Sequence, residues 1–428
     1  MITIANFHSL FLNCTSVSID TRKIEKNSLF VAIKGQNFDA NTFTKEALEK
    51  GAKYAVIDNP NYFIDERTIL VEDSLHSLQE LAKFHRNYLG LPIIALTGSN
   101  GKTTTKELIH AVLSKKYNTR ATIGNLNNHI GVPLTLLRFT KETEIGIVEM
   151  GANHQKEIEF LCGIAQPDYG YITNFGKAHL EGFGGVDGVI KGKSEMYDYL
   201  RNYKKIAFIN LDDTIQKEKG IRIKQFNFGL NESHVDVKID KIEANPMVKI
   251  FFNNLTINSH LIGIYNANNI NAAITIGKYF KISENQIKEA IENYIPENNR
   301  SQLIQKNGNE IILDAYNANP SSMLAAITNF IQLESNHKIA VLGDMFELGE
   351  ESLPEHKKII ALLVSETNIT TYFIGKDFYA NQVQNPHIKF FEDFESFATF
   401  LNVNQPKESL ILIKGSRGMT LEKTLELI

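Results

Sequence analysis

The segment around residue 100 constrains the fold more than any other part of the sequence. An apolar run at residues 93–97 is typical of a buried strand, the loop GSNGKT follows at residues 98–103, and residues 102–114 have a helical pattern. A strand that ends in a glycine-rich loop and continues as a helix directs backbone N–H groups and the positive end of the helix dipole toward an anion. In such loops the lysine contacts the terminal phosphates and the next hydroxyl binds Mg²⁺. The sequence therefore predicts a parallel α/β sheet with a phosphate-binding loop.

The loop differs from the generic phosphate-loop pattern at one position. That pattern has a glycine five residues before Gly101, and this chain has Leu96 there. The loop is thus a shortened variant. A chance Gly-Lys-Thr in a surface turn is the alternative, and the strand and helix patterns on either side argue against it.

Two interruptions divide the chain into three predicted α/β domains, at residues 1–90, 91–297 and 298–428. The first interruption is Gly-Leu-Pro at residues 90–92, after a helical pattern at 75–88, and the second is the polar, proline-containing stretch 295–300. Further buried strands are expected at 145–149, 169–173 and 206–209, so the central domain has a parallel sheet covered by helices. An Asn-Gly hairpin signal at 307–308 and strands at 338–342, 372–374 and 410–413 indicate a Rossmann-like third domain.

Charge and cysteine content exclude several classes of protein. The chain has 45 Lys and Arg against 49 Asp and Glu, and this balance provides no basic surface for nucleic acid or an anionic membrane. Cys14 and Cys162 are far apart and match neither a disulfide framework nor a zinc site. No basic secretion signal or membrane-spanning apolar run is present in the sequence. We expect a cytoplasmic protein without membrane insertion.

Polar residues that follow the buried strands are candidates for the site. Glu149 ends the strand at 145–149, and Asn174 and His179 follow the strand at 169–173. Ligands of open α/β sheets bind beyond the carboxyl ends of the strands, where a carboxylate is a suitable Mg²⁺ ligand. A solvated carboxylate and a structural histidine are the alternatives.

Five sequence blocks carry a resemblance to a known family. The loop TGSNGKTTT (97–105) resembles the one shared by Mur ligases and folylpolyglutamate synthetases, in which the first glycine is commonly absent. Four further blocks are similar to Mur ligases: GNLNNHIGVP (124–133), EMGANH (149–154), DAYNANP (314–320) and LGDMFELG (342–349). The match runs in family order from about residue 18 to the C-terminus.

The resemblance implies an activity. A small N-terminal α/β domain would bind a UDP-linked substrate, a central phosphate-loop domain would bind ATP, and the C-terminal domain would bind the incoming amine and close over the site. The implied reaction joins D-alanyl-D-alanine to UDP-N-acetylmuramoyl-tripeptide through an acyl phosphate, gives ADP and phosphate, and belongs to peptidoglycan synthesis. ATP and Mg²⁺ are the implied cofactors, and a monomer is expected.

The resemblance also implies roles for individual residues. Lys193 matches a lysine that is carbamoylated by carbon dioxide, although Lys191 nearby leaves the register open. Asn266 also suits a helix N-cap, and Tyr265 stands where histidine is usual. The implied catalytic residues are Lys102, Glu149, His179 and Lys193, and the implied Mg²⁺ ligands are Thr103, Glu149, His179 and Lys193. ATP would contact Gly98, Ser99, Asn100, Gly101, Lys102, Thr103, Thr104, Asn266, Asn269, Arg300 and Asp314.

Substrate contacts are implied in all three domains. In the N-terminal domain Arg22 could pair with the diphosphate, and Asn41 stands where histidine is common. His129 and His154 are expected to line the site, and His356 receives only a packing role. The implied substrate-binding residues are Thr21, Arg22, Asp39, Asn41, Asn128, Asn174, Asn317, Asn319, Lys414 and Ser416.

Four alternatives remain. The chain could be the ligase that adds the third peptide residue, a folylpolyglutamate synthetase, or a nucleotide-operated switch that hydrolyses ATP without joining anything. The blocks at 316–320 and 342–345 argue against the first two. A relative without catalysis is disfavoured because Lys102, Glu149, His179 and Lys193 are all present. The sequence does not identify the third peptide residue, diaminopimelate or lysine.

Overall fold

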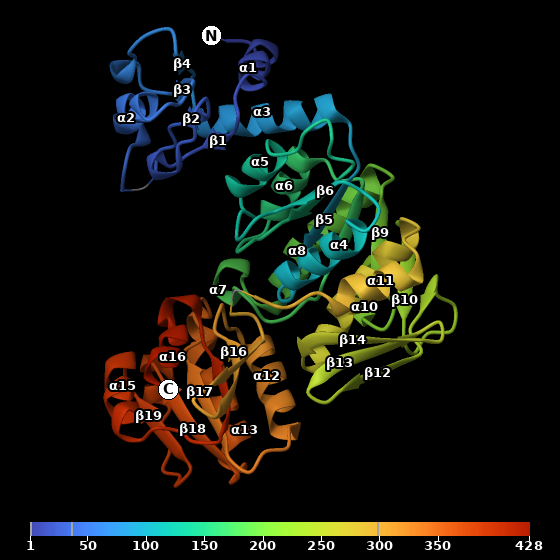
Figure 1. Ribbon diagram of the computed structural model, residues 1–428, viewed down its shortest axis with the longest axis vertical. Coiled ribbons are helices and arrows are strands. Elements are labelled where there is room, and N and C mark those ends of the chain that lie inside the picture. Colours follow the sequence, from blue (N-terminus) through green and yellow to red (C-terminus); the bar gives the residue numbers. More distant parts are fainter. Residues whose placement is uncertain (1, 36, 298) are drawn as a thin grey trace.

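The chain folds into three α/β regions that follow one another along the sequence (Figure 1). The structure is a computed structural model that describes residues 2–35, 37–297 and 299–428. The predicted α/β class with three such regions is confirmed, while the predicted domain limits stay predictions. Among the described residues, no helix is both long and apolar enough to cross a membrane.

The N-terminal region has a four-stranded parallel sheet in the order β1-β2-β3-β4. Helix α3 (Ser74–Leu89) follows; it begins at the N-cap Asp73 and ends at Gly90, which has a left-handed φ of 63°. This helix packs against α1 and β2 on one side and against α5 and α6 of the central region on the other. The other elements of this region are α1 (Ile4–Phe11), β1 (Val17–Ser18), β2 (Leu29–Val31), α2 (Thr44–Glu49), β3 (Tyr54–Ile57) and β4 (Thr68–Leu70). The two helices of the central region that α3 contacts are α5 (Gly131–Leu136) and α6 (Glu157–Ala165).

The central region contains a seven-stranded parallel sheet in the order β11-β10-β9-β8-β5-β7-β6. From β5, the chain adds β6 and β7 on one side and β8 and β9 on the other, which places a topological switch point beside β5. The strands are β5 (Ile93–Thr97), β6 (Thr119–Ala121), β7 (Ile145–Glu149), β8 (Tyr169–Ile172), β9 (Ile206–Asn210), β10 (Lys224–Gly229) and β11 (Val237–Lys238).

Both faces of this sheet are buried, which explains why its strands are continuous apolar runs. Ile93 and Ala95 of β5 pack with α3, α5, α6 and α8, while Ile94 and Leu96 pack with α4, α10 and α11. The remaining helices are α4 (Lys102–Leu113), α7 (Leu180–Phe183), α8 (Val186–Asn202), α9 (Thr214–Lys219), α10 (Ala267–Tyr279) and α11 (Glu284–Glu292).

A small antiparallel sheet beside α10 and α11 is absent from the sequence-based expectations. Its order is β12-β13-β14, with β12 (Lys241–Ala244), β13 (Met247–Phe252) and β14 (Leu255–Ile262). The turn between β13 and β14 is Asn253-Asn254, with φ of 47° and 62°. Asparagine tolerates the left-handed conformation that tight hairpins require, so this Asn-Asn pair was a usable signal in the sequence.

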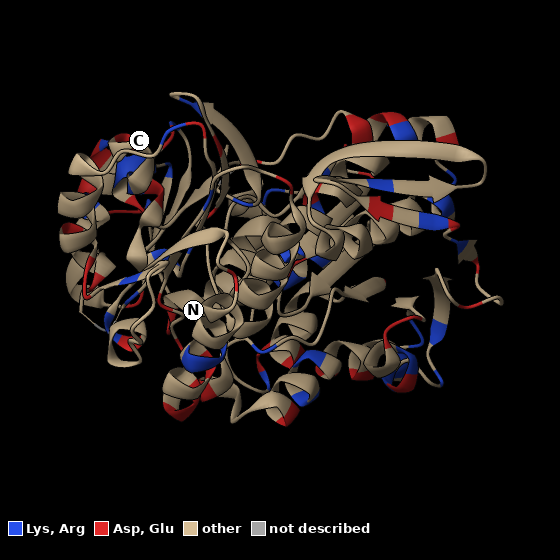
Figure 2. Cartoon of the chain, turned by 90° about the horizontal axis from the view of Figure 1, so that it is seen from below, with Lys and Arg blue, Asp and Glu red and all other residues tan. Residues whose placement is uncertain are grey.

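The C-terminal region is a six-stranded sheet in the order β15-β16-β20-β17-β18-β19. The predicted hairpin is present, because β15 and β16 pair antiparallel around Asn307 and Gly308, and the other strands are parallel. Figure 2 shows basic and acidic residues interspersed along the outer helices of the molecule. The elements are β15 (Gln302–Lys306), β16 (Asn309–Asp314), α12 (Pro320–Gln332), β17 (Lys338–Gly343), α13 (Ser352–Val364), β18 (Ile369–Ile374), α14 (Lys376–Ala380), β19 (Ile388–Phe391), α15 (Phe394–Val403), β20 (Leu410–Lys414) and α16 (Thr424–Leu427).

Candidate active site

The phosphate loop lies at the switch point, between β5 and the first turn of α4. Gly98 and Gly101 have φ of 143° and 77°. A Cβ atom on Gly98 would lie 2.0 Å from Thr173 Oγ1, and one on Gly101 would lie 2.5 Å from Asn269 Oδ1. Both positions therefore require glycine on grounds of conformation and of space.

Lys102 bends back over the loop that it follows. Its Nζ donates to the carbonyl oxygens of Gly98 at 2.7 Å and Ser99 at 3.3 Å. Burial lowers the pKa of Lys102, and the nearby carboxylate of Glu149 opposes that shift. An ammonium that is held by loop carbonyls is well placed to exchange them for phosphate oxygens.

Glu149 ends β7 with its side chain 2% exposed. Its Oε1 accepts from Asn127 Nδ2 at 2.8 Å, while Lys106 Nζ lies 3.9 Å from Oε2. Within the part of the chain that the structure describes, Oε2 is buried and has no hydrogen-bond partner. A buried carboxylate oxygen without a partner lacks the hydrogen bonds that usually compensate for burial, and a bound cation would supply that compensation.

The surrounding residues suit Mg²⁺ better than they suit a metal whose ligands are all protein side chains. The described residues contain no group of three or more His, Cys, Asp or Glu with metal-binding geometry. Mg²⁺ usually binds one or two carboxylates together with phosphate oxygens and water. Glu149 and the hydroxyl of Thr103 line one cavity with the phosphate loop, and this donor set fits Mg²⁺ held with a nucleotide.

His179 and Lys193 approach the loop from the α7–α8 segment. His179 has a left-handed φ of 54° and lines the cavity, and its Nδ1 contacts a carboxylate oxygen of Glu347. Lys193 is 1% exposed, and its Nζ donates to Ala152 O at 3.1 Å and lies 4.9 Å from the Phe183 ring. Burial, reinforced by the charge of Lys102, lowers the pKa of Lys193 well below its ordinary value.

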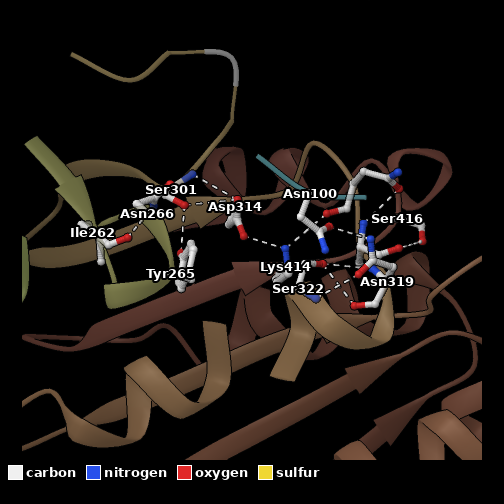
Figure 3. A network of polar contacts seen from close by, with 12 residues as sticks. Asn100, Ile262, Tyr265, Asn266, Ser301, Asp314, Asn319, Ser322, Lys414 and Ser416 are labelled. Atoms are coloured by element: carbon white, nitrogen blue, oxygen red, sulfur yellow. Dashed lines mark hydrogen bonds and ion pairs between the residues drawn. The ribbon is translucent and has the colours of Figure 1, made fainter. Parts of the chain in front are cut away.

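On the opposite wall, two neighbouring strands of the C-terminal sheet present an ion pair (Figure 3). Lys414 at the end of β20 lies 2.6 Å from Asp314 Oδ2 at the end of β16, and its Nζ also donates to Asn317 O at 3.2 Å. Asp314 Oδ1 accepts from Ser301 N at 3.1 Å, and Ser301 Oγ lies 3.0 Å from the Tyr265 hydroxyl. A polar chain thus links the central and C-terminal regions.

A second connection joins the phosphate loop itself to the C-terminal region (Figure 3). Asn319 Nδ2 donates to Asn100 Oδ1 at 2.7 Å. The same Asn319 side chain caps α12, because its Oδ1 accepts from Ser322 N at 2.9 Å. Asn100 is also held by Asn174, whose Oδ1 accepts from Asn100 N at 3.0 Å. One amide therefore fixes both the start of α12 and a residue of the phosphate loop.

Two of the predicted ATP contacts, Asn266 and Asn269, are asparagines that bond to each other. Asn269 Nδ2 donates to Asn266 Oδ1 at 2.8 Å, and Asn269 Oδ1 accepts from Thr105 Oγ1 at 3.0 Å. Asn266 stands at the N-cap position of α10 without a side-chain capping bond, and its Nδ2 donates to Ile262 O at 2.8 Å. Arg300 lies nearby with its guanidinium carbon 3.6 Å from the centre of the Tyr316 ring.

One cavity of about 790 Å³ brings most of the predicted residues together. It is lined from both sides, by the central and the C-terminal regions. His129 also lines it, as predicted for that residue, and His154 does not. The predicted residues on its wall are Ser99, Asn100, Gly101, Lys102, Thr103, Thr104, Asn128, Glu149, Asn174, His179, Asn266, Asn269, Arg300, Asp314, Asn317, Asn319 and Lys414.

The remaining predicted residues lie off this wall. Gly98 supplies the carbonyl for Lys102, and Lys193 sits behind Ala152, which does line the cavity. Ser416 is 2% exposed and accepts from Phe346 N at 2.9 Å. The hydroxyl therefore supports the backbone here, and its predicted substrate contact stays a prediction.

The four predicted UDP contacts lie in the N-terminal region. Arg22 has a side chain that is 86% exposed and is paired with Asp20 at 2.8 Å, beside Thr21. Asn41 is fully buried, and its Nδ2 donates to Asp39 at 2.6 Å and to Asp58 at 2.8 Å. The amide of Asn41 thus ties two loops together, while its contact with UDP stays a prediction.

Some residues of the cavity carried no predicted role. Asn127 holds Glu149, Tyr316 stacks under Arg300, and Ser301 bridges Tyr265 and Asp314. Asn127 and Tyr316 are members of sequence blocks that had already been singled out, so their position in those blocks was the available signal. Ser301 has no such signal, because its role depends on the meeting of two regions.

Comparisons with known proteins agree with this geometry. Three family models match: the Mur ligase family catalytic domain at residues 13–86, the Mur ligase middle domain at 96–277, and the Mur ligase glutamate ligase domain at 299–417. The chain is 35% identical over 420 residues to the UDP-N-acetylmuramoyl-tripeptide--D-alanyl-D-alanine ligase of Bacillus subtilis, covering 96% of this chain and 92% of that protein.

Solved structures give the same result. MurF from Acinetobacter baumannii has a TM-score of 0.86 and 30% identity, covering 99% of this chain and 97% of that one. MurF ligase from Thermotoga maritima in complex with ADP has a TM-score of 0.84 and 27% identity, with 97% of each chain covered. The three matched models together span most of the sequence, and their boundaries fall near α3 and near residue 298. The chain therefore belongs to the Mur ligase family.

Proposed function

We propose that this chain joins D-alanyl-D-alanine to UDP-N-acetylmuramoyl-tripeptide at the expense of ATP, in the cytoplasmic part of peptidoglycan synthesis. The supporting observation is the cavity itself, which places a phosphate loop on one wall and Lys414, Asn317 and Asn319 on the other. A nucleotide and an amine that are bound by different regions can meet there. The Bacillus subtilis relative reported above is named for this ligation.

The reaction needs activation, because joining a carboxylate to an amine in water is unfavourable. The terminal carboxylate of the tripeptide attacks the γ-phosphorus of ATP, ADP leaves, and an acyl phosphate forms. The dipeptide amine then attacks the acyl carbon, phosphate leaves with the bonding electrons, and the amine loses a proton. In-line phosphoryl transfer depends chiefly on positioning and on neutralisation of the oxygens.

Residues of this chain have matching roles in the proposal. Lys102 and the backbone amides of the loop bind the phosphates, and Glu149 and Thr103 would hold Mg²⁺, with His179 as a further ligand. The metal, when bound, neutralises phosphate charge and orients the reacting oxygens. Lys414 orients a carboxylate of the dipeptide, in exchange for its bond to Asp314.

Carbamoylation of Lys193 is part of the proposal. A neutral amine is the form that adds to carbon dioxide, giving a carbamate and releasing one proton, and burial favours the neutral form of a lysine. Lys193 is buried with a lowered pKa, whereas Lys191 is exposed. These facts support Lys193 over Lys191 as the modified residue.

The function is tested by phosphate release under substrate omission. We expect release only when ATP, the UDP-linked tripeptide and D-alanyl-D-alanine are all present, with a ligated product by mass spectrometry. Release that does not depend on the dipeptide would identify a nucleotide switch instead. Exchange of diaminopimelate for lysine in the tripeptide identifies the accepted third residue.

Lys193 is tested separately. Lys193→Ala should lower ligation at least about 100-fold with an unchanged unfolding midpoint, since loss of a catalytic group typically costs two or more orders of magnitude. A short carboxylic acid that occupies the space should restore part of the activity, and Lys191→Ala is the matched control. Retained activity in Lys193→Ala would remove this residue from the site.

A further inference from the structure

The contact between His179 and Glu347 joins two segments that are 168 residues apart. His179 lies before α7 in the central region, and Glu347 lies in the loop between β17 and α13 of the C-terminal region. A carboxylate can only accept at neutral pH, so His179 Nδ1 carries the proton and donates it to Glu347. The Nε2 lone pair is then available on the ring edge that is free of Glu347, and His179 lines the cavity.

The loop that carries Glu347 is anchored by hydrogen bonds at three successive residues, through the side chain of the first and the backbone amides of the next two. Asp344 accepts from the amides of Asp377 and Phe378, each at 3.0 Å. His356 Nε2 accepts from Met345 N at 3.0 Å, and Ser416 Oγ accepts from Phe346 N at 2.9 Å. Residues 344–346 are therefore held one after another directly before Glu347. This arrangement accounts for the burial of His356 and Ser416, neither of which lies on the cavity wall.

The two segments also meet through their backbones. Glu181 N donates to Glu347 O at 3.4 Å, and a Cβ atom on Gly349 would lie 3.3 Å from Glu181 Cβ. Both His179 and Glu347 have left-handed backbones, with φ of 54° and 61°. Non-glycine residues rarely adopt this conformation, and they do so where the surrounding structure determines it. The contact is thus a built docking point between the two regions.

Stability is a poor explanation for this pair. The Glu347 side chain is 53% exposed and that of His179 is 21% exposed, and exposed ion pairs contribute little to folding. Orientation of the His179 ring is a better explanation. A histidine that binds metal usually donates its other ring N–H to a carboxylate, and this bond fixes both the tautomer and the direction of the ring. Here that carboxylate comes from a different region of the protein than the histidine.

We infer that Glu347 is a positioning residue for His179 and that docking of the C-terminal region sets the ring of His179 for Mg²⁺ binding. The inference rests on the proposed function for its catalytic consequence and on the geometry alone for the tautomer. It couples the arrangement of the regions to the metal site: when the C-terminal region withdraws, Glu347 leaves and the ring loses its fixed orientation. Amine binding and metal binding are then favoured in the same state of the molecule.

The first test measures the tautomer without metal or substrate. Nitrogen NMR of histidine-labelled protein, with His179→Gln to assign the signal, should show the Nδ1–H tautomer for His179. Glu347→Ala should shift the ring toward the Nε2–H tautomer, while Glu347→Gln, which keeps an acceptor oxygen, should retain the Nδ1–H form. An identical His179 signal in wild type and Glu347→Ala would overturn the inference.

The second test measures the Mg²⁺ dependence of ligation. Loss of a carboxylate that orients a metal ligand typically costs 10–100-fold in metal affinity or activity, so Glu347→Ala should raise the half-saturating Mg²⁺ concentration about 10-fold. The KM for the UDP-linked tripeptide should change less than about 2-fold, and Glu347→Gln should recover most of the loss. Glu350→Ala removes an exposed charge three residues away and should match wild type.

The two tests separate failure of this inference from failure of the proposed function. If wild type does not ligate the dipeptide, the proposed function is wrong while the tautomer measurement still stands. If wild type ligates and Glu347→Ala has a wild-type Mg²⁺ dependence, Glu347 does not position His179. An unchanged urea midpoint for Glu347→Ala establishes that any loss is not unfolding.

Discussion

The two junctions between regions of this chain are built from different chemistry. At the first, α3 is shared, and the Arg86 side chain, 9% exposed, donates to Asp168 at 2.8 Å and to the carbonyls of Ala165 and Gln166. His85 continues the junction, with Nδ1 accepting from His8 at 2.9 Å and Nε2 donating to Phe139 O at 2.9 Å. Arg86, His8 and His85 are buried, while the Asp168 side chain is 25% exposed at the edge of the junction.

The second junction also contains polar contacts, and each of them includes a side chain that is partly exposed. Asn319 bonds to Asn100, Glu347 to His179, and Lys177 Nζ, with a side chain that is 40% exposed, lies 2.7 Å from Glu355. Buried contacts resist separation, whereas exposed polar contacts exchange readily with water. We propose that the first junction is fixed and that the second opens and closes, which is the motion that a ligase with its substrates bound to different regions needs.

The largest predicted effect is at the fixed junction. Arg86→Ala leaves two carbonyls without their donor and Asp168 with Lys205 as its remaining ion-pair partner. Removal of one member of a buried pair is strongly destabilising, and we expect a loss of about 3 kcal/mol in urea unfolding. Arg67→Ala, which removes an exposed pair with Asp65 in the same region, should cost under about 1 kcal/mol. Equal losses in the two variants would contradict the comparison.

The second-largest effect is a loss of stability at the first junction as the pH falls. Burial, with a smaller contribution from the charge of His85, lowers the pKa of His8 from 6.5 to about 4, and burial also lowers the pKa of His85. Below pH 6.5 the unfolded chain takes up protons that the folded chain does not, so stability is lost as pH falls toward about 4, by on the order of 2 kcal/mol for His8. The difference in urea midpoint between wild type and His8→Phe should therefore decrease as the pH falls through this range. His76→Gln, an exposed histidine of α3, should follow wild type, and a flat difference would refute the assignment.

A smaller effect is expected where the movable junction meets the phosphate loop. Asn319→Ser retains a residue that caps helices well but is too short to reach Asn100. Ligation should fall about 10-fold, equivalent to the loss of one hydrogen bond in the closed state, while the unfolding free energy changes by under about 0.5 kcal/mol. Asn319→Ala should show the same kinetic loss plus about 1 kcal/mol of destabilisation. Wild-type kinetics for Asn319→Ser would exclude the Asn100 contact from function.

The smallest effect belongs to the exposed pair of the movable junction. Lys177→Ala should change stability by under about 1 kcal/mol but should shift the solution scattering of the protein toward a more open envelope. Lys358→Ala is the matched control, because Lys358 pairs with the same Glu355 from within the C-terminal region. Scattering curves that do not differ between the two variants would argue against a role for this pair in closure.

Local parts of this molecule could be predicted from the sequence, and contacts between distant parts could not. The phosphate loop, β5 and α4 are consecutive, so strand, turn and helix signals reinforce one another there. The roles of Glu347, Ser301 and Ser416 depend on segments about 13 to 168 residues away that only the folded chain brings together. The amide of Asn41 was read as a ligand contact, and burial among Asp39 and Asp58 gives it a structural task that a single sequence does not reveal.

The shared helix α3 also limits how this protein can be recombined. The apolar side chains that α3 packs against α5 and α6 belong to one continuous core that includes Leu78, Leu81 and Ala82. A chimaera joined just before residue 91 would place α3 against helices that it did not evolve to pack with, and apolar surface left exposed by a poor fit promotes aggregation. The same core cluster continues into the C-terminal region through Met345 and Leu348, beside the docking point of Glu347, so an exchange of that region near residue 299 should succeed only where the donor keeps apolar side chains at these two positions.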